Sequence, residues 1–375
     1  MKRLALLLML VIAPVATAGA TAFPGTWRPL PKAPIVPDDG GFASAWTGRE
    51  VLVFGRHRRT ALDARGNPYI VGRTNVAAAY DTARKTWRRL SPPKPTPSFM
   101  DNDAVWTGKE VLVWGQGTRL AYNPQTNRWR RLPGSPLLSI HDGHGIVVWT
   151  GRDMIGWGGG CCGDAFSDGV AYNPKTNRWR ALAPTPLAGD QSPLGAWTGR
   201  ELVLFVGNLN PDTGKPWPAR LARAAAYNPA TDTWRRIAPL PAPRGGANAV
   251  WDGHEILVVD GAAGRTAPRV GFAYNPATNR WRRLPPMESG RIGAAAVWSG
   301  SRLLLWGGTT RPGSNAVPRH GLAYDPRTNS WSPLPQAPLA GRAQPTAVWT
   351  GHSMVIWGGG TKTDGAAFTP GRRAS

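Results

Sequence analysis

A short polar run, His141-Asp142-Gly143-His144, is the first candidate for chemistry in this sequence. Imidazole nitrogens and carboxylates bind zinc and similar metals, usually as sets of three or four protein donors. This run supplies no third ligand at a fixed spacing, so its metal signal is weak. We expect no bound metal and keep His141, Asp142 and His144 as candidates for contact with a ligand.

Two adjacent cysteines, Cys161 and Cys162, are the only cysteines in the chain. Neighbouring Cα atoms lie ~3.8 Å apart across a trans peptide, whereas ordinary disulfides span ~4.4–6.8 Å. A bridge between them would be strained and easily reduced, although a disulfide is the default in an oxidising compartment. We expect the vicinal bridge, with free thiols or an intermolecular bridge as alternatives. Asp164, in the same loop, is a further ligand candidate.

The segment 158–163 has the Gly-x-Gly-x-x-Gly spacing of dinucleotide-binding loops. Such a loop needs a following helix whose N-terminus binds the pyrophosphate. A strand pattern follows here instead, so we expect no cofactor. The sequence also contains no Gly-x-Ser-x-Gly, His-Glu-x-x-His or Walker motif, which would indicate a hydrolase, a metalloprotease or a nucleotide-binding enzyme.

These candidates lie within a repeat that occupies most of the chain. Two phrases marked by tryptophan alternate along it. The first, small and apolar residues before Trp-(Thr/Asp/Ser)-Gly, contains Trp46, Trp106, Trp149, Trp197, Trp251, Trp298 and Trp349. The second, tryptophan before basic and apolar residues, contains Trp27, Trp87, Trp129, Trp179, Trp234, Trp281 and Trp331. Copies recur about every 50 residues, which is longer than the WD40 period and matches that of kelch repeats.

Each copy has the pattern of four short strands, which we call a to d. In the second copy they are 104–106, 110–114, 120–122 and 128–132. Thr-Gly and Asn-Pro-x-Thr-Asn segments, which suit tight turns, follow strands a and c. Strand b is apolar throughout, as burial on both faces requires. The arginines of strand d are expected to face outward, where charge resists aggregation at the sheet edge.

The repeat resembles the kelch family. That family's strand b ending in Gly-Gly matches Trp306-Gly307-Gly308 and Trp357-Gly358-Gly359, and its Tyr-Asp-Pro-x-Thr-x-x-Trp matches 324–331. Most other copies have Asn instead of that Asp. The resemblance covers roughly 27 to 370 and implies an all-β, seven-bladed propeller of four-stranded blades. It implies no single function, because kelch propellers include both binders and enzymes.

The two ends of the repeat are complementary. The chain begins with a lone strand d at 27–31 and ends with strands a, b and c over 346–368. Their pairing would complete the seventh blade and close the ring, which removes free sheet edges. We expect a signal peptide at 1–22, a propeller over 23–370 and a disordered tail at 371–375.

The N-terminus has the features of an export signal. Two basic residues precede an apolar run from Leu4 to Val15, and Ala18 or Ala22 ends a small-x-small cleavage site. The run is shorter than the ~20 residues of a membrane span. We expect a monomer, secreted to the periplasm or outside the cell, with no membrane span. The net charge of +23 favours anionic polymers as partners, but nucleic acid is not expected for an exported chain.

Strand order decides which loops share a face. The short, uniform a–b and c–d turns lie at one face, and the variable b–c and d–a loops lie at the other. Variable loops on a rigid scaffold commonly carry function, so we expect ligand contact on the b–c/d–a face. Trp217 and Tyr69 lie in b–c loops and are not required by the repeat. Both are ligand candidates, unless each only packs its own loop.

A second set of candidates opens the innermost strand, seven residues before each strand a tryptophan. The residues at this position are Asp39, Phe99, Asp142, Asp190, Arg244, Arg291 and Arg342. Three consecutive blades offer Arg and three others Asp, which predicts a channel mouth with a cationic and an anionic side. The alternative is that these side chains tie the blades together. Burial of all three arginines against backbone carbonyls would remove their ligand role.

The sequence favours a non-catalytic extracellular binding protein for a glycan, an anionic wall polymer or a protein. The alternative is a sugar-active enzyme (an epimerase, lyase or oxidase) at the channel mouth. Similarity to galactose oxidase would imply copper bound by two tyrosines, one cross-linked to cysteine, and two histidines. Here Tyr69 is the only loop tyrosine and the two cysteines are adjacent, which disfavours copper-radical chemistry. A buried acid–base pair in a concave pocket would favour the enzyme.

Overall fold

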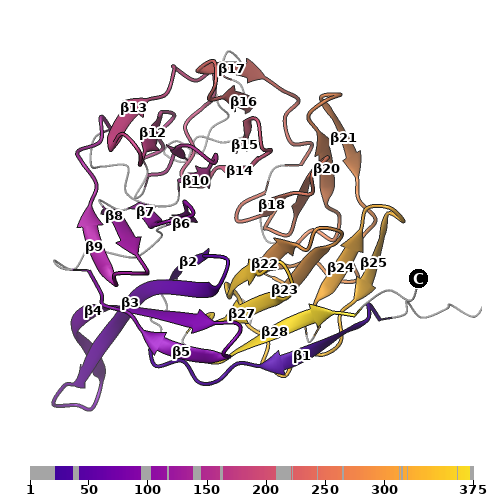
Figure 1. The fold of residues 1–375 in the computed structure, drawn as a ribbon. Coiled ribbons are helices and arrows are strands. Elements are labelled where there is room, and N and C mark those ends of the chain that lie inside the picture. The colour runs from indigo at the N-terminus through magenta and orange to yellow at the C-terminus, as the bar shows by residue number, and fades with distance from the viewer. Residues whose placement is uncertain are drawn as a thin grey trace, which may run out of the picture.

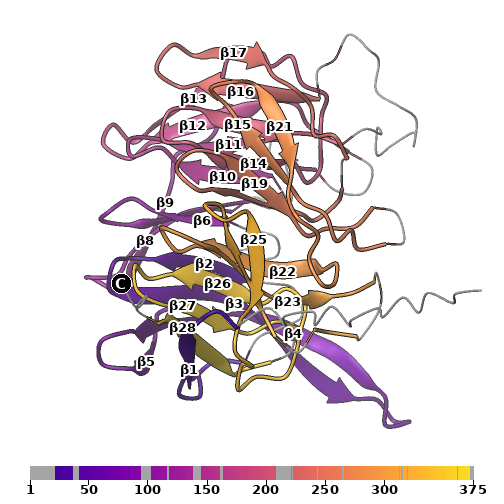
Figure 2. The ribbon, with the colours of Figure 1, turned by 90° about the vertical axis from the view of Figure 1, so that its right-hand side faces the viewer.

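The computed structural model describes residues 22–36, 42–93, 103–115, 118–137, 145–160, 164–207, 221, 223–242, 244–263, 266–311, 313, 316–318, 320–360 and 362–371. None of these residues lies in a helix, so none forms a helix long and apolar enough to cross a membrane. Their 28 strands form seven separate four-stranded sheets. Figure 1 shows these sheets arranged as blades around a ring, and Figure 2 shows them from the side. The predicted all-β, seven-bladed propeller is confirmed.

Blades 1 to 6 follow the chain in order, and their first strands contact one another around the centre of the ring. Blades 1 and 2 comprise β2 (Phe42–Trp46), β3 (Glu50–Leu62), β4 (Pro68–Asp81), β5 (Thr86–Arg89), β6 (Asp103–Trp106), β7 (Val111–Gly115), β8 (Thr118–Asn123) and β9 (Arg128–Arg131). Blades 3 and 4 comprise β10 (Ile146–Trp149), β11 (Met154–Trp157), β12 (Gly169–Asn173), β13 (Arg178–Ala181), β14 (Leu194–Trp197), β15 (Leu202–Phe205), β16 (Ala224–Asn228) and β17 (Thr233–Arg236). Blades 5 and 6 comprise β18 (Asn248–Trp251), β19 (Ile256–Val259), β20 (Phe272–Asn275), β21 (Arg280–Arg283), β22 (Ile292–Trp298), β23 (Leu303–Thr309), β24 (Leu322–Asp325) and β25 (Ser330–Pro333).

Blade 7 contains strands from both ends of the described chain. It comprises β26 (Thr346–Trp349), β27 (Met354–Trp357), β28 (Gly365–Pro370) and β1 (Gly25–Pro29). β1 is the outer strand and pairs antiparallel with β28, as Figure 1 shows. The first strand, β26, contacts those of blades 6 and 1. Segments far apart in the sequence therefore meet in one sheet.

Aromatic side chains between neighbouring blades hold the outer strands in place. In blade 2, the fully buried Tyr122 ring packs on Trp129 with 4.9 Å between centroids. The Trp129 indole donates a hydrogen bond to the Ser91 carbonyl of blade 1 at 2.7 Å. The Tyr122 hydroxyl donates to Asn127 at 2.8 Å. Asn127 itself has a φ of 54°, a left-handed conformation that asparagine tolerates in turns. The Asn-Pro-x-Thr-Asn segment therefore sets the c–d turn and anchors the buried tyrosine.

The strand d arginines do more than form a charged edge, which corrects the sequence expectation. Arg130 donates two bonds to Glu110 at the start of strand b, at 3.1 and 2.7 Å. It also donates to the Tyr172 hydroxyl of blade 3 at 3.3 Å. Equivalent contacts to the next blade are Arg28–Tyr80, Arg180–Tyr227 and Arg282–Tyr324. Each of these arginines therefore bridges two blades.

The segment 56–75 contains Tyr69, which the sequence analysis placed in a b–c loop, but it is an extension of the strand b–strand c hairpin. β3 and β4 pair continuously from Glu50↔Asp81 to Leu62↔Pro68, with one irregularity between Arg59 and Thr60. Figures 1 and 2 show this hairpin projecting away from the ring of blades. We call residues 56–75 the arm. The loop expectation was wrong because the ladder of backbone hydrogen bonds continues past the end of the blade.

Candidate functional site

Arg291, one of the three arginines that open an innermost strand, binds the protein's own backbone. Its side chain is fully buried and donates to the carbonyls of Gly307 at 2.9 Å and His320 at 2.8 Å. Burial lowers the pKa of the guanidinium to about 10. At neutral pH it stays charged and is held by fixed carbonyl dipoles, which are the partners that a buried cation requires.

Arg342 and Arg244 make comparable contacts. Arg342 is buried and donates to the Gly358 carbonyl at 3.2 Å, and it forms an ion pair with Asp364 at 2.6 Å. Arg244 is half-buried and donates to the Val270 carbonyl at 3.0 Å. Arg291 and Arg342 are therefore buried parts of the scaffold and are not available to a ligand. Arg244 is only half-buried and stays a candidate for ligand contact.

Of the three aspartates predicted to form the anionic side of the channel mouth, only Asp190 lies within the described residues. Asp190 accepts hydrogen bonds from the backbone N–H groups of Gly207 at 2.5 Å and Ser192 at 2.8 Å. Burial raises the pKa of its carboxyl. Asp164 is exposed, and its carbonyl accepts a bond from the Gln191 side chain at 2.8 Å. The remaining candidates lie outside the described residues: Asp39, Phe99, His141, Asp142, His144, Cys161, Cys162 and Trp217.

A buried carboxylate that the sequence analysis did not identify lies between blades 5 and 6. Asp260 follows β19, is fully buried, and accepts bonds from the N–H groups of Gly261 at 2.6 Å and Ala294 at 2.7 Å. The Asn248 amide donates a third bond at 3.2 Å. Burial raises the pKa of Asp260 to about 6. Asn248 belongs to β18 and Ala294 to β22, so this carboxylate links the innermost strands of blades 5 and 6.

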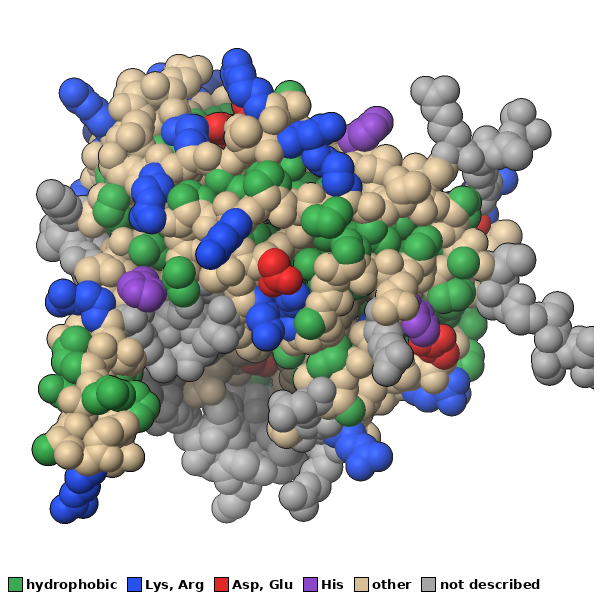
Figure 3. Space-filling view, turned by 90° about the horizontal axis from the view of Figure 1, so that it is seen from below, with side chains coloured by type: hydrophobic (Ala, Val, Ile, Leu, Met, Phe, Trp, Pro, Cys, Tyr) green, Lys and Arg blue, Asp and Glu red, His purple; other side chains and the backbone are tan. Residues whose placement is uncertain are grey.

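The arm places Tyr69 in solvent together with other large apolar side chains. Leu62, Tyr69, Ile70 and Val71 are 68%, 52%, 43% and 47% exposed, respectively. Among the described residues, Val36 is the one other large hydrophobic residue that is exposed. Figure 3 shows hydrophobic side chains gathered on a lobe that projects at the left, where Figure 1 places the arm. Tyr69 therefore lies about half in solvent and stays a candidate for ligand contact.

Hydrogen bonds hold the tip of the arm in a defined turn. The Asp63 carboxylate accepts the N–H groups of Arg65 and Asn67, both at 2.8 Å. Gly66 has a φ of 81°, which a residue without Cβ adopts freely. The exposed arginines Arg59 and Arg65 flank the apolar residues. The arm is therefore an ordered hairpin with apolar and cationic side chains in solvent.

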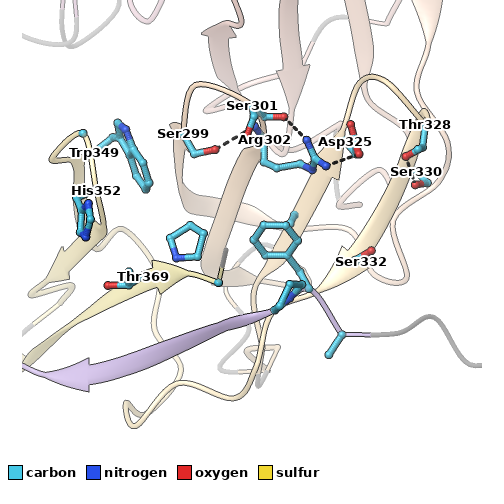
Figure 4. A pocket seen from close by; sticks show the side chains of 17 residues that line it. Ser299, Ser301, Arg302, Asp325, Thr328, Ser330, Ser332, Trp349, His352 and Thr369 are labelled. Atoms are coloured by element: carbon cyan, nitrogen blue, oxygen red, sulfur yellow. Dashed lines mark hydrogen bonds and ion pairs between the residues drawn. The ribbon is translucent and has the colours of Figure 1, made fainter. Parts of the chain in front are cut away.

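A hollow of about 640 Å³ lies at the outer part of the junction between blades 6 and 7. The a–b turns of both blades line it, together with the c–d turn of blade 6 and residues 22–24 and 369–371. This is the a–b/c–d face, opposite to the face that the sequence analysis favoured. Figure 4 shows Trp349 and His352 on one side of the hollow and Ser332 on the other.

Departures from the repeat coincide with this hollow. Ser332 occupies the strand d position that holds the bridging arginine in other blades, and Arg302 occupies the strand b position of glutamate. Phe368 occupies the strand c position of tyrosine and offers no hydroxyl. Arg302 instead forms an ion pair with Asp325 at 2.5 Å, and both side chains are buried. The long side chain that joins blades elsewhere is therefore absent here. A position-by-position comparison of the copies could have found this signal.

Comparisons with known proteins agree with this fold. A family model described as the Kelch motif matches residues 290–338. The chain is similar to a solved fungal alcohol oxidase of the AA5 family in complex with copper, with a TM-score of 0.71 and 15% identity over 92% of this chain and 76% of that one. No curated protein matches the sequence. At this identity the likeness to the oxidase shows the fold alone. The molecule is a seven-bladed β-propeller whose sixth blade matches the Kelch motif.

The described residues do not fit a copper site. Within the ranges that the structure covers, no three His, Cys, Asp or Glu side chains group as a metal centre would require. Tyr69 lies on the exposed arm. The other six tyrosines are fully buried strand c residues: Tyr80, Tyr122, Tyr172, Tyr227, Tyr274 and Tyr324. We therefore derive no copper chemistry for this chain.

Proposed function

We propose that this chain is an extracellular, non-catalytic binding propeller that holds a protein partner through the arm. The observation that carries the proposal is the exposure of Leu62, Tyr69, Ile70 and Val71 on a projecting hairpin. Large exposed apolar groups on an otherwise polar surface are typical of protein interaction sites. Export, which the proposal assumes, rests on the sequence of residues 1–22.

Both faces of the arm carry apolar side chains. The pairs Thr60↔Ile70 and Leu62↔Pro68 place Leu62 and Ile70 on one face, and the pair Ala61↔Tyr69 places Tyr69 on the other. A hairpin in water usually keeps one face polar, and an isolated two-stranded hairpin is marginally stable at best. An arm of this composition suits insertion into a groove that covers both of its faces.

Charge selects the kind of partner. The exposed Arg59 and Arg65 flank the apolar tip, and the chain carries a net charge of +23. A second copy of the same chain would be repelled at long range, whereas an acidic surface would be attracted. We therefore propose a partner protein whose groove is apolar within and acidic at its rim.

Among the residues that the structure covers, the enzyme alternative has one acid–base pair on the b–c/d–a face. His320 Nε2 lies 2.6 Å from a carboxylate oxygen of Glu288. The two side chains are 35% and 46% exposed, and neither lines the hollow between blades 6 and 7. A buried pair in a concave pocket was the feature that would favour catalysis, and this pair does not have it.

Site-directed photocross-linking tests the proposal. A photoreactive residue replaces Ile70, and in a control protein it replaces Lys109, which lies in an exposed a–b turn. Each protein is incubated with the culture fluid and envelope fraction of the organism that makes it. We expect a discrete protein adduct from position 70 only, and its loss when Leu62→Ser and Tyr69→Ser are added. Equal labelling from both positions, or none from position 70, would contradict the proposal. If no protein adduct forms but the protein binds a glycan array through the arm, the partner is a glycan and not a protein.

A further inference from the structure

The hollow between blades 6 and 7 is built from side chains that suit a small polar ligand. Hydroxyl groups come from both blades, including Ser299, Ser301, Ser332 and Thr369. The half-buried Trp349 adds an indole. Figure 4 shows Trp349 at the left of this space, Ser299 and Ser301 at the top and Ser332 at the right. Hydroxyls that donate and accept, beside one flat apolar ring, offer the two kinds of contact that a sugar ring needs.

Arg302 and Asp325, which line the hollow, pair with each other. Arg302 lies within 2.5 Å of the Asp325 carboxylate and also donates to the Ser301 carbonyl at 2.7 Å. The same carboxylate accepts the backbone N–H of Arg327 at 2.9 Å. An anionic ligand would meet Asp325, and a cationic ligand would meet Arg302. A neutral ligand meets no uncompensated charge in this pair.

The size of the hollow sets the size of the ligand. Its volume of about 640 Å³ falls within the range of about 300–1,000 Å³ that small-molecule sites usually have. We propose that this hollow binds a neutral mono- or disaccharide, on the face opposite to the arm. The apolar face of the sugar packs on Trp349, and its hydroxyl groups bind the serine and threonine hydroxyls and the exposed His352.

The repeat itself provides the variant that closes the hollow. Blade 5 has Glu255, Asn275 and Arg282 at the positions of Arg302, Asp325 and Ser332. The triple variant Arg302→Glu, Asp325→Asn and Ser332→Arg copies that set and leaves the net charge of the chain unchanged. Its new arginine extends from β25 into the hollow, as Arg282 extends from β21 toward blade 6. Because the set already occurs in a neighbouring blade, the variant is expected to fold.

Titration calorimetry tests the inference. Wild-type protein is titrated with glucose, galactose, mannose, N-acetylglucosamine, lactose, maltose and cellobiose, and with glucuronate as a charged counterpart. At least one neutral sugar should bind about tenfold or more tightly than glucuronate, and the triple variant should lose that binding by a similar factor. The variant Lys109→Ala, in an a–b turn of blade 2, should bind as wild type does. His352→Ala should weaken binding several-fold.

Two outcomes would overturn the inference. One is that no sugar of the panel binds to the wild-type protein. The other is that the triple variant, with a melting temperature equal to or above that of wild type, binds as wild type does. The experiment requires no partner of the arm, so its result is independent of the photocross-linking from Ile70.

Discussion

The junctions on the two sides of blade 6 differ in their outer contacts. At the junction of blades 5 and 6, Arg282 donates to Glu255 at 2.6 Å and to Tyr324 at 3.1 Å. At the junction of blades 6 and 7, Ser332 and Phe368 occupy the equivalent positions, and the hollow lies beside them. The arginine bridge is therefore not required for two blades to pack.

Other contacts are shared by both junctions. The Trp331 indole donates to the Pro285 carbonyl at 3.0 Å, and the Trp27 indole donates to the Pro335 carbonyl at 2.8 Å. Each junction also has a buried apolar cluster. The difference shows that apolar packing and the tryptophan hydrogen bond hold the blades together. The residue at the position of the bridging arginine is therefore free to change, and a binding site can form where a shorter residue replaces it.

Truncation of Phe368 is expected to have the largest effect on this comparison. Its ring is fully buried and packs on Trp27 with 5.1 Å between centroids. Phe368→Ala should lower the free energy of unfolding by about 3–5 kcal/mol, because it leaves a cavity where no polar bridge compensates. Urea denaturation measures this loss, and Phe368→Leu is the matched control with a smaller loss. If Phe368→Ala lowered the free energy of unfolding by less than Phe368→Leu does, packing would not be what holds blade 7 to blade 6.

The pH dependence of stability tests the inner contact between blades 5 and 6. The pKa of Asp260 is about 6 in the folded protein and 3.8 in a model compound. The folded state therefore binds this proton more strongly, and stability falls as pH rises from about 4 to about 6. A shift of two pKa units corresponds to a change of roughly 3 kcal/mol.

Asp260→Asn removes this titration. We expect the unfolding free energy of the variant, relative to wild type, to rise by roughly 3 kcal/mol between pH 4 and pH 7. The two proteins share all other titrating groups, so the difference isolates this carboxyl. Denaturation curves at one-unit intervals of pH give the measurement. A difference that stays constant across this range would mean that Asp260 has an ordinary pKa.

Arg282→Ser makes the junction of blades 5 and 6 resemble that of blades 6 and 7. The Arg282 side chain is 36% exposed and its partner Glu255 is 12% exposed, so solvent screens much of the ion pair. The expected loss is at most about 1 kcal/mol, as measured by thermal unfolding. A loss as large as that of Phe368→Ala would show that the bridge is essential where it occurs.

Tyr69→Ser on the arm should change stability least. More than half of the Tyr69 side chain is exposed, and the arm extends beyond the blades. A surface change of this kind is expected to stay within about 0.5 kcal/mol in urea denaturation. The same variant should reduce the adduct formed from position 70. Marked destabilisation would show that the arm packs against the propeller instead of serving a partner.

The repeat predicted the fold well because its signals are local. Asn123 illustrates this: its side-chain oxygen accepts the N–H groups of Gln125 and Thr126 at 2.9 and 3.2 Å, so five consecutive residues determine the c–d turn. The site was harder to predict, because the effect of Ser332 depends on a contact between blades. The arginine that it replaces would reach a residue of the next copy, as Arg130 reaches Tyr172. A pattern within one copy does not contain that information.

Arg291 shows a second limit of the sequence. Its position at the start of an innermost strand was evident, but the carbonyls of Gly307 and His320 that bind it come from elsewhere in the fold. Charge alone suggested a ligand, whereas the backbone supplies the partners. The arm was misread for a related reason, because its pairing from Arg56↔Asn75 outward has no clear apolar–polar alternation in the sequence.

The pairing of β1 with β28 has a consequence for the order of assembly. Among the strands that the structure describes, β1 is synthesised first and its hydrogen-bonding partner β28 last. Ring contacts between blades 1 to 6 can form while β1 is still unpaired, but blade 7 and the hollow beside it require both β1 and β28. Because contacts between distant segments form slowly, blade 7 is expected to be the last blade to assemble, and sugar binding would report that final step.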